Sequence, residues 1–149
     1  MKPRPKYRIE HYETADGDAP VHRWFVEELV PETAAILGIA MRHHLQEYGA
    51  DVVRTRYGRA LGGGLYEFRF DDTIDEVLGR LGKTRTSKLA KARSGALLLR
   101  VFFHVHGNKV ILLLGGYDKG KHPAKSRQQR EIQVARERLA DWKRRHPGA

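Results

Sequence analysis

Two arginines lie in short strand-like segments, where their side chains are suited to gripping phosphate. Residues 65–70 alternate aromatic and polar side chains, which puts Glu67 and Arg69 on one face. Arg100 falls on the less apolar face of residues 97–105. If these segments pair in a sheet, both guanidinium groups project from the same face, where a planar fork can hold two phosphate oxygens. The alternative is that each arginine only pairs with a carboxylate at a sheet edge.

A run of lysines follows the next apolar segment and adds point charges near that face. The longest apolar run, residues 110–114, leads to Tyr117, after which Lys119, Lys121 and Lys125 follow in a basic loop. Together with the strand arginines, these lysines would form a cationic concavity for a phosphodiester. Tyr117 could stack on a base or donate a proton there, although a tyrosine at the rim of a core is the commoner case.

The chain contains eight histidines, and two of them share the surroundings of these basic residues. His104 lies on the same strand face as Arg100, and His122 lies within the lysine run. Imidazole can act as a general acid or base near neutral pH, so both are candidate RNA-binding residues, beside the alternative of a structural role. The adjacent His43 and His44 lack the spacing of a helical zinc site, and no cysteine occurs. We therefore expect neither a metal nor a cofactor.

The positive charge of the chain is concentrated toward its end. Lys and Arg number 28 and Asp and Glu 18, which gives a net charge of +10. Residues 119–146 contain ten of the basic residues and three of the acidic ones, so +7 of that charge lies there. This asymmetry indicates a polyanionic partner, although a basic helix can also serve solubility alone.

Apolar periodicity predicts one α+β domain over residues 1–149, with helices on one face of a mostly antiparallel sheet. No apolar run approaches the roughly 20 residues that span a bilayer, and no apolar signal region follows the basic start, so we expect a cytoplasmic protein with no membrane partner. Residues 62–64 are three glycines without the Lys-Ser/Thr of a P-loop, and they lead into a strand. The expected elements are a strand at 7–14, helices at 20–30 and 32–48, a loop at 49–64, a strand at 65–70, a long flexible loop at about 71–96, strands at 97–105 and 110–117, and a helix at 126–145.

Three stretches of this chain resemble one family of bacterial toxins. Residues 20–29 (PVHRWFVEEL) are similar to its opening helix, and residues 63–69 (GGLYEFR) to its first meander strand. The third stretch begins with LRVFF at 99–103 and VILLL at 110–114 and ends with EIQVARERLADW at 131–142. In order and spacing these motifs resemble the phage-derived, HigB-like toxins of the RelE/ParE toxin–antitoxin superfamily, over most of the chain except residues 71–96.

The resemblance implies a RelE-like fold, with an N-terminal strand and helical hairpin, a three-stranded antiparallel meander and a C-terminal helix. It also implies the toxin of a type II toxin–antitoxin system: a metal-independent, ribosome-associated mRNA endoribonuclease that inhibits translation and arrests growth. Arg69 and Arg100 would clamp the scissile phosphate. Glu67 is a candidate general base because it lies on the same strand face as Arg69. Lys119, assigned to catalysis, and Lys121 and Lys125 would orient the phosphate or hold the RNA backbone.

Partners and alternatives follow from the same resemblance. A cognate antitoxin protein is expected to mask the basic surface in a toxin–antitoxin hetero-oligomer, and mRNA and the ribosome would be the targets. Two departures concern the chemistry: no His-Tyr pair ends the chain, and the lysine pair is split by Gly120. The alternatives are a ParE-like inhibitor of a protein such as DNA gyrase, and a nucleic-acid-binding module without catalysis.

Overall fold

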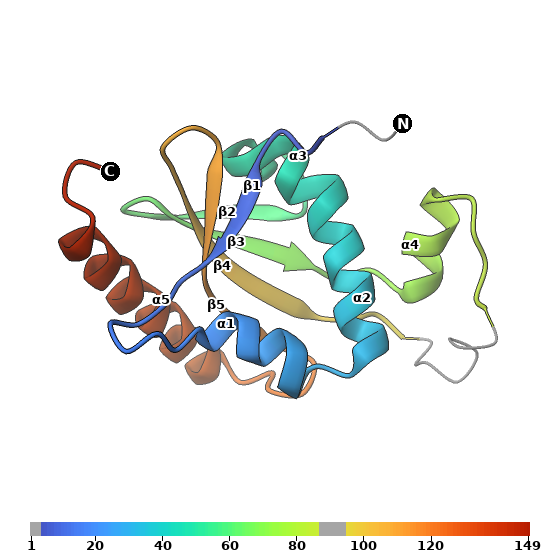
Figure 1. Cartoon of the computed structure of the whole chain (residues 1–149). Helices are drawn as coiled ribbons and strands as arrows, with labels where there is room; N and C mark the ends of the chain where they lie inside the picture. The colour runs from blue at the N-terminus through green and yellow to red at the C-terminus, as the bar shows by residue number, and fades with distance from the viewer. Residues whose placement is uncertain (1–3, 87–94) are drawn as a thin grey trace.

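The computed structural model describes residues 4–86 and 95–149, which form five strands in one mixed sheet. The strands are β1 (Arg8–His11), β2 (Gly58–Gly62), β3 (Leu65–Phe70), β4 (Leu99–His106) and β5 (Val110–Asp118). They lie in the order β1-β5-β4-β3-β2 (Figure 1). β1 runs parallel to β5, and the other neighbouring pairs are antiparallel. The expected α+β class is therefore confirmed.

The helices begin where the sequence places helix-starting prolines. Pro20 and Pro31 occupy the first turns, where a missing backbone N–H leaves no bond unmade. α1 (Pro20–Arg23) continues as a π-helical turn over Trp24–Glu28, and α2 (Pro31–Ala40) continues through a π-helical turn over Met41–Leu45. The remaining helices are α3 (Gln46–Tyr48), a 3-10 helix (Gly49–Arg54), α4 (Ile74–Arg80) and α5 (Lys125–Arg145).

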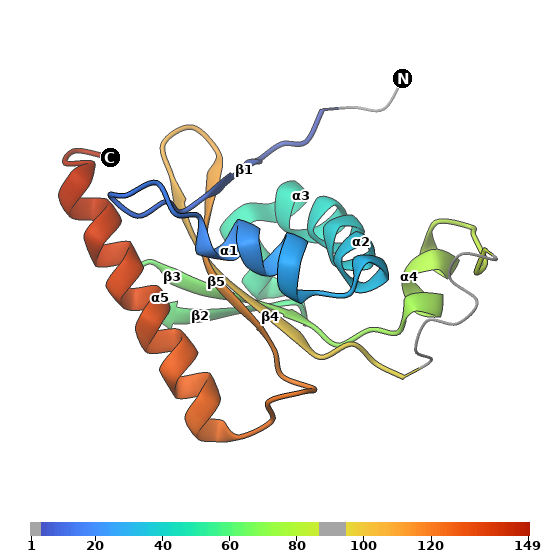
Figure 2. The ribbon, with the colours of Figure 1, turned by 60° about the horizontal axis from the view of Figure 1, so that its bottom comes forward.

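Apolar side chains cover both faces of the sheet, so the helices lie on two sides of it. α1 and α2 pack with Phe103 of β4 and with Ile111 and Leu113 of β5. α5 packs instead with Phe102 and Leu112. Figure 2 shows α5 on one side of the sheet and α1 and α2 on the other. The expectation that all helices share one face is wrong, because β4 and β5 are apolar at successive positions and each face needs its own cover.

One strand was not expected from the sequence. β2, Gly58–Gly62, lies in the predicted loop at 49–64 and pairs antiparallel with β3. Its sequence, GRALG, has low strand propensity, and most of its residues are exposed or half-buried at the sheet edge. The meander therefore has four antiparallel strands, and the expected three-stranded meander is corrected.

The predicted long loop at 71–96 begins with a helix. Thr73 and Glu76 form a capping box at the start of α4, and Ile74, Val77 and Leu78 are buried. The predicted loop therefore contains a helix of seven residues. Residues 87–94 of the predicted loop lie outside the described residues.

A buried carboxylate joins α4 to the sheet. Asp72 is 1 % exposed and accepts a hydrogen bond from the Tyr57 hydroxyl at 2.7 Å. Arg56 and Arg80 pair with the same carboxylate at 3.0 and 2.7 Å. Two cations and one hydroxyl compensate the burial of this charge, as a buried carboxylate requires.

The C-terminal half of α5 fixes that helix to the sheet. Ala135, Leu139 and Trp142 are buried and Ile132 is partly buried, as the expected apolar stripe predicts. The part of α5 before Ala135 contains no fully buried side chain. The hold of α5 on the sheet is therefore uneven along its length.

A polar contact near Trp142 reinforces this anchor. The Asp141 carboxylate accepts hydrogen bonds from the Arg145 guanidinium at 2.8 Å and the Tyr12 hydroxyl at 2.5 Å. The bond from Arg145, and then that from Tyr12, lowers the pKa of Asp141 from 3.8 to about 2.

A glycine lets α1 approach the sheet closely, which predicts a steric effect on stability. A Cβ at Gly116 would lie 2.5 Å from Cζ3 of Trp24, so we expect Gly116→Ala to lower the free energy of unfolding by about 1–3 kcal/mol. The control is Gly38→Ala, where a Cβ meets nothing within 4 Å. There we expect no loss, or a gain of up to about 1 kcal/mol, because alanine favours a helix. Urea unfolding measures both, and equal losses would contradict the close packing at Gly116.

The lowered pKa of Asp141 predicts a pH dependence of stability. Since the folded-state pKa is about 2 and the ordinary value is 3.8, the stabilisation is present above pH 4 and is lost as pH falls toward 2. We expect Asp141→Asn to flatten thermal stability across this window. Asp16→Asn, in the exposed turn after β1, is the control. An unchanged slope in Asp141→Asn would rule out this contribution.

Candidate nucleic-acid interface

Sheet register brings the expected arginines together. Arg69 on β3 lies directly opposite Arg100 on β4, and Arg100 lies opposite Tyr117 on β5. Glu67 lies two residues before Arg69 and therefore on the same face. This is the face that α5 covers, so the predicted sharing of one sheet face is confirmed.

Arg100 is buried and already engaged. Its residue is 2 % exposed, and its Nη1 donates to Asp71 Oδ1 at 2.6 Å and to the carbonyl oxygen of Leu99 at 3.0 Å. Asp71 stands at the end of β3, with its side chain 46 % exposed. The alternative considered for Arg100, a pair with a carboxylate, is thus present in the structure.

Glu67 lies beneath the first turns of α5. It is fully buried, and its Oε2 accepts a hydrogen bond from Gln128 Nε2 at 3.2 Å. Its Oε1 lies 3.5 Å from Arg69 Nε, which is an ion pair without hydrogen-bond geometry. Arg69 differs from its neighbours because its side chain is 37 % exposed. Of the two arginines, Arg69 is the one within reach of solvent.

Four buried polar atoms of this cluster make no hydrogen bond with a described residue. They are Glu67 Oε1, Arg69 Nε, Arg100 Nε and the Tyr117 hydroxyl. Leaving such a group unpaired costs about 1–3 kcal/mol, and native proteins concentrate the exceptions at working sites. We name Glu67, Arg69, Arg100 and Tyr117 the sheet cluster; it retains unused hydrogen-bonding capacity.

The tyrosine of the sheet cluster is held neutral. Burial raises the pKa of the Tyr117 phenol above its usual value of 10; the Arg100 charge lowers it and Glu67 raises it. The Arg127 guanidinium lies 5.9 Å from the Tyr117 ring centroid. A neutral phenol can donate a hydrogen bond or a proton at neutral pH.

A cleft of about 350 Å³ adjoins the sheet cluster at Tyr117. It opens between α1, the end of β5, the loop at 119–124 and α5. We name it the α1–α5 cleft, and its lining residues are Pro20, Val21, Arg23, Trp24, Glu28, Leu29, Gly116, Tyr117, Asp118, Lys121, His122, Arg127, Glu131 and Arg138.

Of the expected RNA-binding residues, Tyr117, Lys121 and His122 line this cleft. Lys119 is half-buried in the loop, and its backbone N–H donates to the Leu98 carbonyl at 2.8 Å. Lys125 is exposed as the first residue of α5. The structure thus divides the expected basic site between the sheet cluster, the cleft and two lysines outside the cleft lining.

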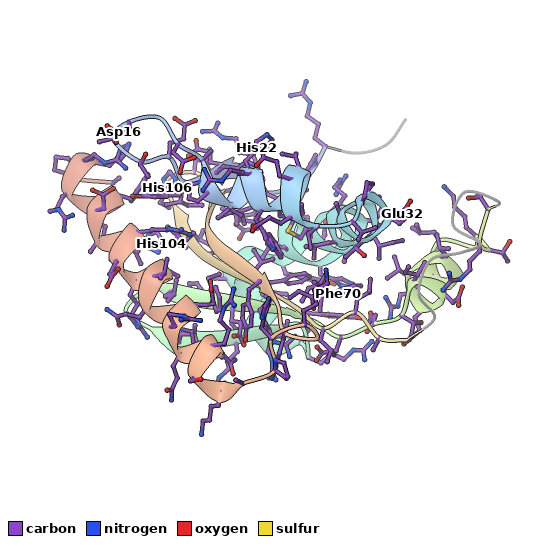
Figure 3. All side chains as sticks on the ribbon, turned by 90° about the horizontal axis from the view of Figure 1, so that it is seen from below. Asp16, His22, Glu32, Phe70, His104 and His106 are labelled. Carbon is purple, nitrogen blue, oxygen red and sulfur yellow. The ribbon has the colours of Figure 1, made fainter. Side chains whose placement is uncertain are left out.

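His104 lies apart from the other expected site residues. Its Nδ1 is 2.6 Å from the Gly64 carbonyl, and its ring is 6.1 Å from that of Trp142. Burial lowers the pKa of His104, which the contact with Gly64 partly offsets. Figure 3 shows His104 beside α5 and far from Phe70, the neighbour of Arg69. These contacts give His104 a structural role in holding the turn between β2 and β3.

Several partners at the site were missed by sequence reasoning. Asp71 and Gln128 contact Arg100 and Glu67, and Arg23 and Arg138 line the cleft. The fold brings these residues together from α1, the end of β3 and α5. Contacts between elements so far apart in the sequence cannot be predicted from the spacing of residues. The one available signal was the acidic start of residues 71–76, which follows β3 directly.

Neither a family model nor a curated protein matches this chain. Within residues 4–86 and 95–149, no group of three or more His, Asp or Glu side chains is arranged to hold a metal ion. None of the helices in the same residues combines the length and apolarity needed to cross a membrane.

The unpaired hydroxyl in the sheet cluster predicts a contrast between two buried tyrosines. Tyr117→Phe removes a hydroxyl that has no hydrogen-bond partner among the described residues, so we expect the free energy of unfolding to stay within about 1 kcal/mol or to rise. Tyr57→Phe removes a donor to Asp72 and should cost about 1–3 kcal/mol. Chemical unfolding of both variants measures the difference. A loss at Tyr117 as large as at Tyr57 would show that its hydroxyl has a structural partner.

Proposed function

We propose that this protein is an RNA-cleaving toxin of the HigB-like kind, acting on mRNA without a metal. The observation that supports it best is the direct cross-strand pairing of Arg69 and Arg100 on a face that also carries Glu67 and Tyr117. A carboxylate, a neutral phenol and two cations can supply the base, the acid and the charge stabilisation that phosphodiester cleavage by a ribose hydroxyl uses.

The proposed reaction uses the RNA's own 2′-hydroxyl as the nucleophile. Glu67 accepts the proton of this hydroxyl as its oxygen attacks the adjacent phosphorus. The bond from phosphorus to the 5′ oxygen breaks, and the departing oxygen takes a proton from Tyr117. Arg69 and Arg100 stabilise the negative charge that builds up on the phosphate oxygens, and Lys119 adds a positive charge nearby.

Cleavage requires access to groups that α5 covers in the structure. Glu67 and Arg100 are buried, yet α5 has no fully buried side chain before Ala135. Gln128 forms a single hydrogen bond to Glu67 in this region. The first turns of α5 are therefore the part that has to move for RNA to reach the carboxylate.

The same burial favours a second candidate function, which is RNA binding without cleavage. In that case Arg69, Lys121 and Lys125 contact phosphates, while Glu67 and Arg100 serve the core. Binding would then weaken steeply with salt and leave the RNA intact. For either function, the ribosome, a cytoplasmic location and an antitoxin partner that forms a hetero-oligomer with this chain remain proposals.

Arg69 provides the sharpest test, because it belongs to the sheet cluster and is exposed enough for replacement to spare the fold. We expect Arg69→Gln to lower mRNA cleavage about 100- to 1,000-fold, as loss of one charge-stabilising donor does, and to abolish growth arrest. Induced expression in a bacterial host, with growth and mRNA integrity followed together, measures both effects.

The matched control is Arg54→Gln, which removes the same charge from an exposed position in the 3-10 helix. It should arrest growth like the wild type. Arrest with intact mRNA would replace the nuclease proposal by a protein target such as gyrase. Salt-sensitive RNA binding by the wild type, with neither arrest nor cleavage, would favour the binding module.

A further inference from the structure

Positive side chains from three separate elements converge on the α1–α5 cleft. Arg23 comes from α1, Lys121 from the loop after β5, and Arg127 and Arg138 from α5. These like charges repel one another, and the secondary structure does not require all four side chains to face the same cleft. Arg23 pairs with Asp18, which lies just before α1 and outside the lining, so a negative counterpart is still favoured for the other three cations.

The acidic residues of the lining do not supply that counterpart in full. Glu131 pairs with Arg127 at 2.9 Å, and Asp118 Oδ1 accepts the backbone N–H of Lys121 at 3.2 Å. Glu28 is exposed and forms no ion pair with a described residue. Neither Lys121 nor Arg138 has a carboxylate partner within the part of the chain that the structure describes.

Among these cations, Arg138 gives the strongest support for a bound anion. It is half-buried, and its only hydrogen bond to a described residue runs from Nη1 to the Leu114 carbonyl at 2.8 Å. Burial lowers its pKa, and the Arg23 charge lowers it further, against the opposing effect of Glu131. Partial burial of a guanidinium that has no carboxylate partner costs free energy, and a bound anion would offset that cost.

Aromatic and apolar side chains complete the lining of the cleft. Tyr117 is 2 % exposed and its hydroxyl lacks a hydrogen-bond partner among the described residues. Trp24 and Leu29 form the apolar part of the wall. A volume of about 350 Å³ lies at the lower end of small-ligand pockets and exceeds what a bare phosphate ion fills.

We propose that the α1–α5 cleft binds a nucleotide by its phosphate group, which Arg23, Arg138 and Lys121 hold. The nucleotide is either one unit of an RNA chain or a free mononucleotide, since both present the same phosphate chemistry. This site lies beside the sheet cluster. If the bound phosphate belongs to RNA, the site deepens the proposed function and rests on it; a site for a free mononucleotide does not depend on it.

Titration calorimetry on the full chain tests the site with three probes: inorganic phosphate, adenosine monophosphate and a short single-stranded RNA. The double variant Arg23→Gln/Lys121→Gln removes two exposed cations and leaves the half-buried Arg138 in place. We expect it to bind the mononucleotide roughly tenfold to a hundredfold more weakly than the wild type. Backbone NMR signals of Gly116 and Lys121 should shift when the nucleotide is added.

The control is Arg54→Gln/Lys83→Gln, which removes one arginine and one lysine from exposed positions outside the cleft. It should bind like the wild type; an equal loss in both double variants would overturn the site in favour of general charge. No binding of the mononucleotide or RNA by the wild type would overturn it as well. Binding of RNA alone, lost in the cleft variant, would support the site and assign its phosphate to RNA.

These outcomes are independent of the nuclease test. Cleavage that depends on Arg69, without nucleotide binding in the cleft, would refute only the cleft proposal. Nucleotide binding in the cleft of a protein that leaves mRNA intact would refute only the nuclease proposal.

Discussion

The arrangement of this protein depends on the burial of β4 and β5 on both faces. Successive apolar residues in these strands leave no polar side that could face water, so helices have to cover the sheet twice. α1 and α2 supply one layer, and α5 supplies the other. The second layer also places α5 over the face that carries Glu67 and Arg100, and these two charged groups are buried.

Strong periodicity made much of the fold predictable from the sequence. The two helix-starting prolines, the alternation at 65–70 and the apolar stripe of α5 each indicated the right element. β2 was missed because glycine, arginine and alanine form its strand only with the help of β3. The single helical face was wrong because strand alternation reveals which residues share a face but does not reveal what covers it.

The candidate site was predictable in its strand residues and not in its surroundings. Alternation put Glu67, Arg69 and Arg100 on one face, and the register confirmed it. Burial, the Asp71 ion pair and the Gln128 contact all depend on where α5 and the β3 end lie in space. For the same reason, Arg23 and Arg138 could not be joined to Lys121 before the helical layers were known. A shared face is also not sufficient for two residues to lie together. His104 is on the same face as Arg100 but lies too far along β4 to belong to the sheet cluster.

The parallel pairing of β1 with β5 affects how the chain folds during its synthesis. Arg8 pairs with Val110, so the first strand to leave the ribosome finds its neighbour only after some hundred further residues have been made. Such distant pairing slows folding, because the loop entropy is lost before the contact forms. α5, which completes the second layer and the cleft, is synthesised later still. Chains cut short before Tyr117 would therefore lack part of the sheet cluster, and chains that end before Lys125 would lack the helix that lines one side of the cleft.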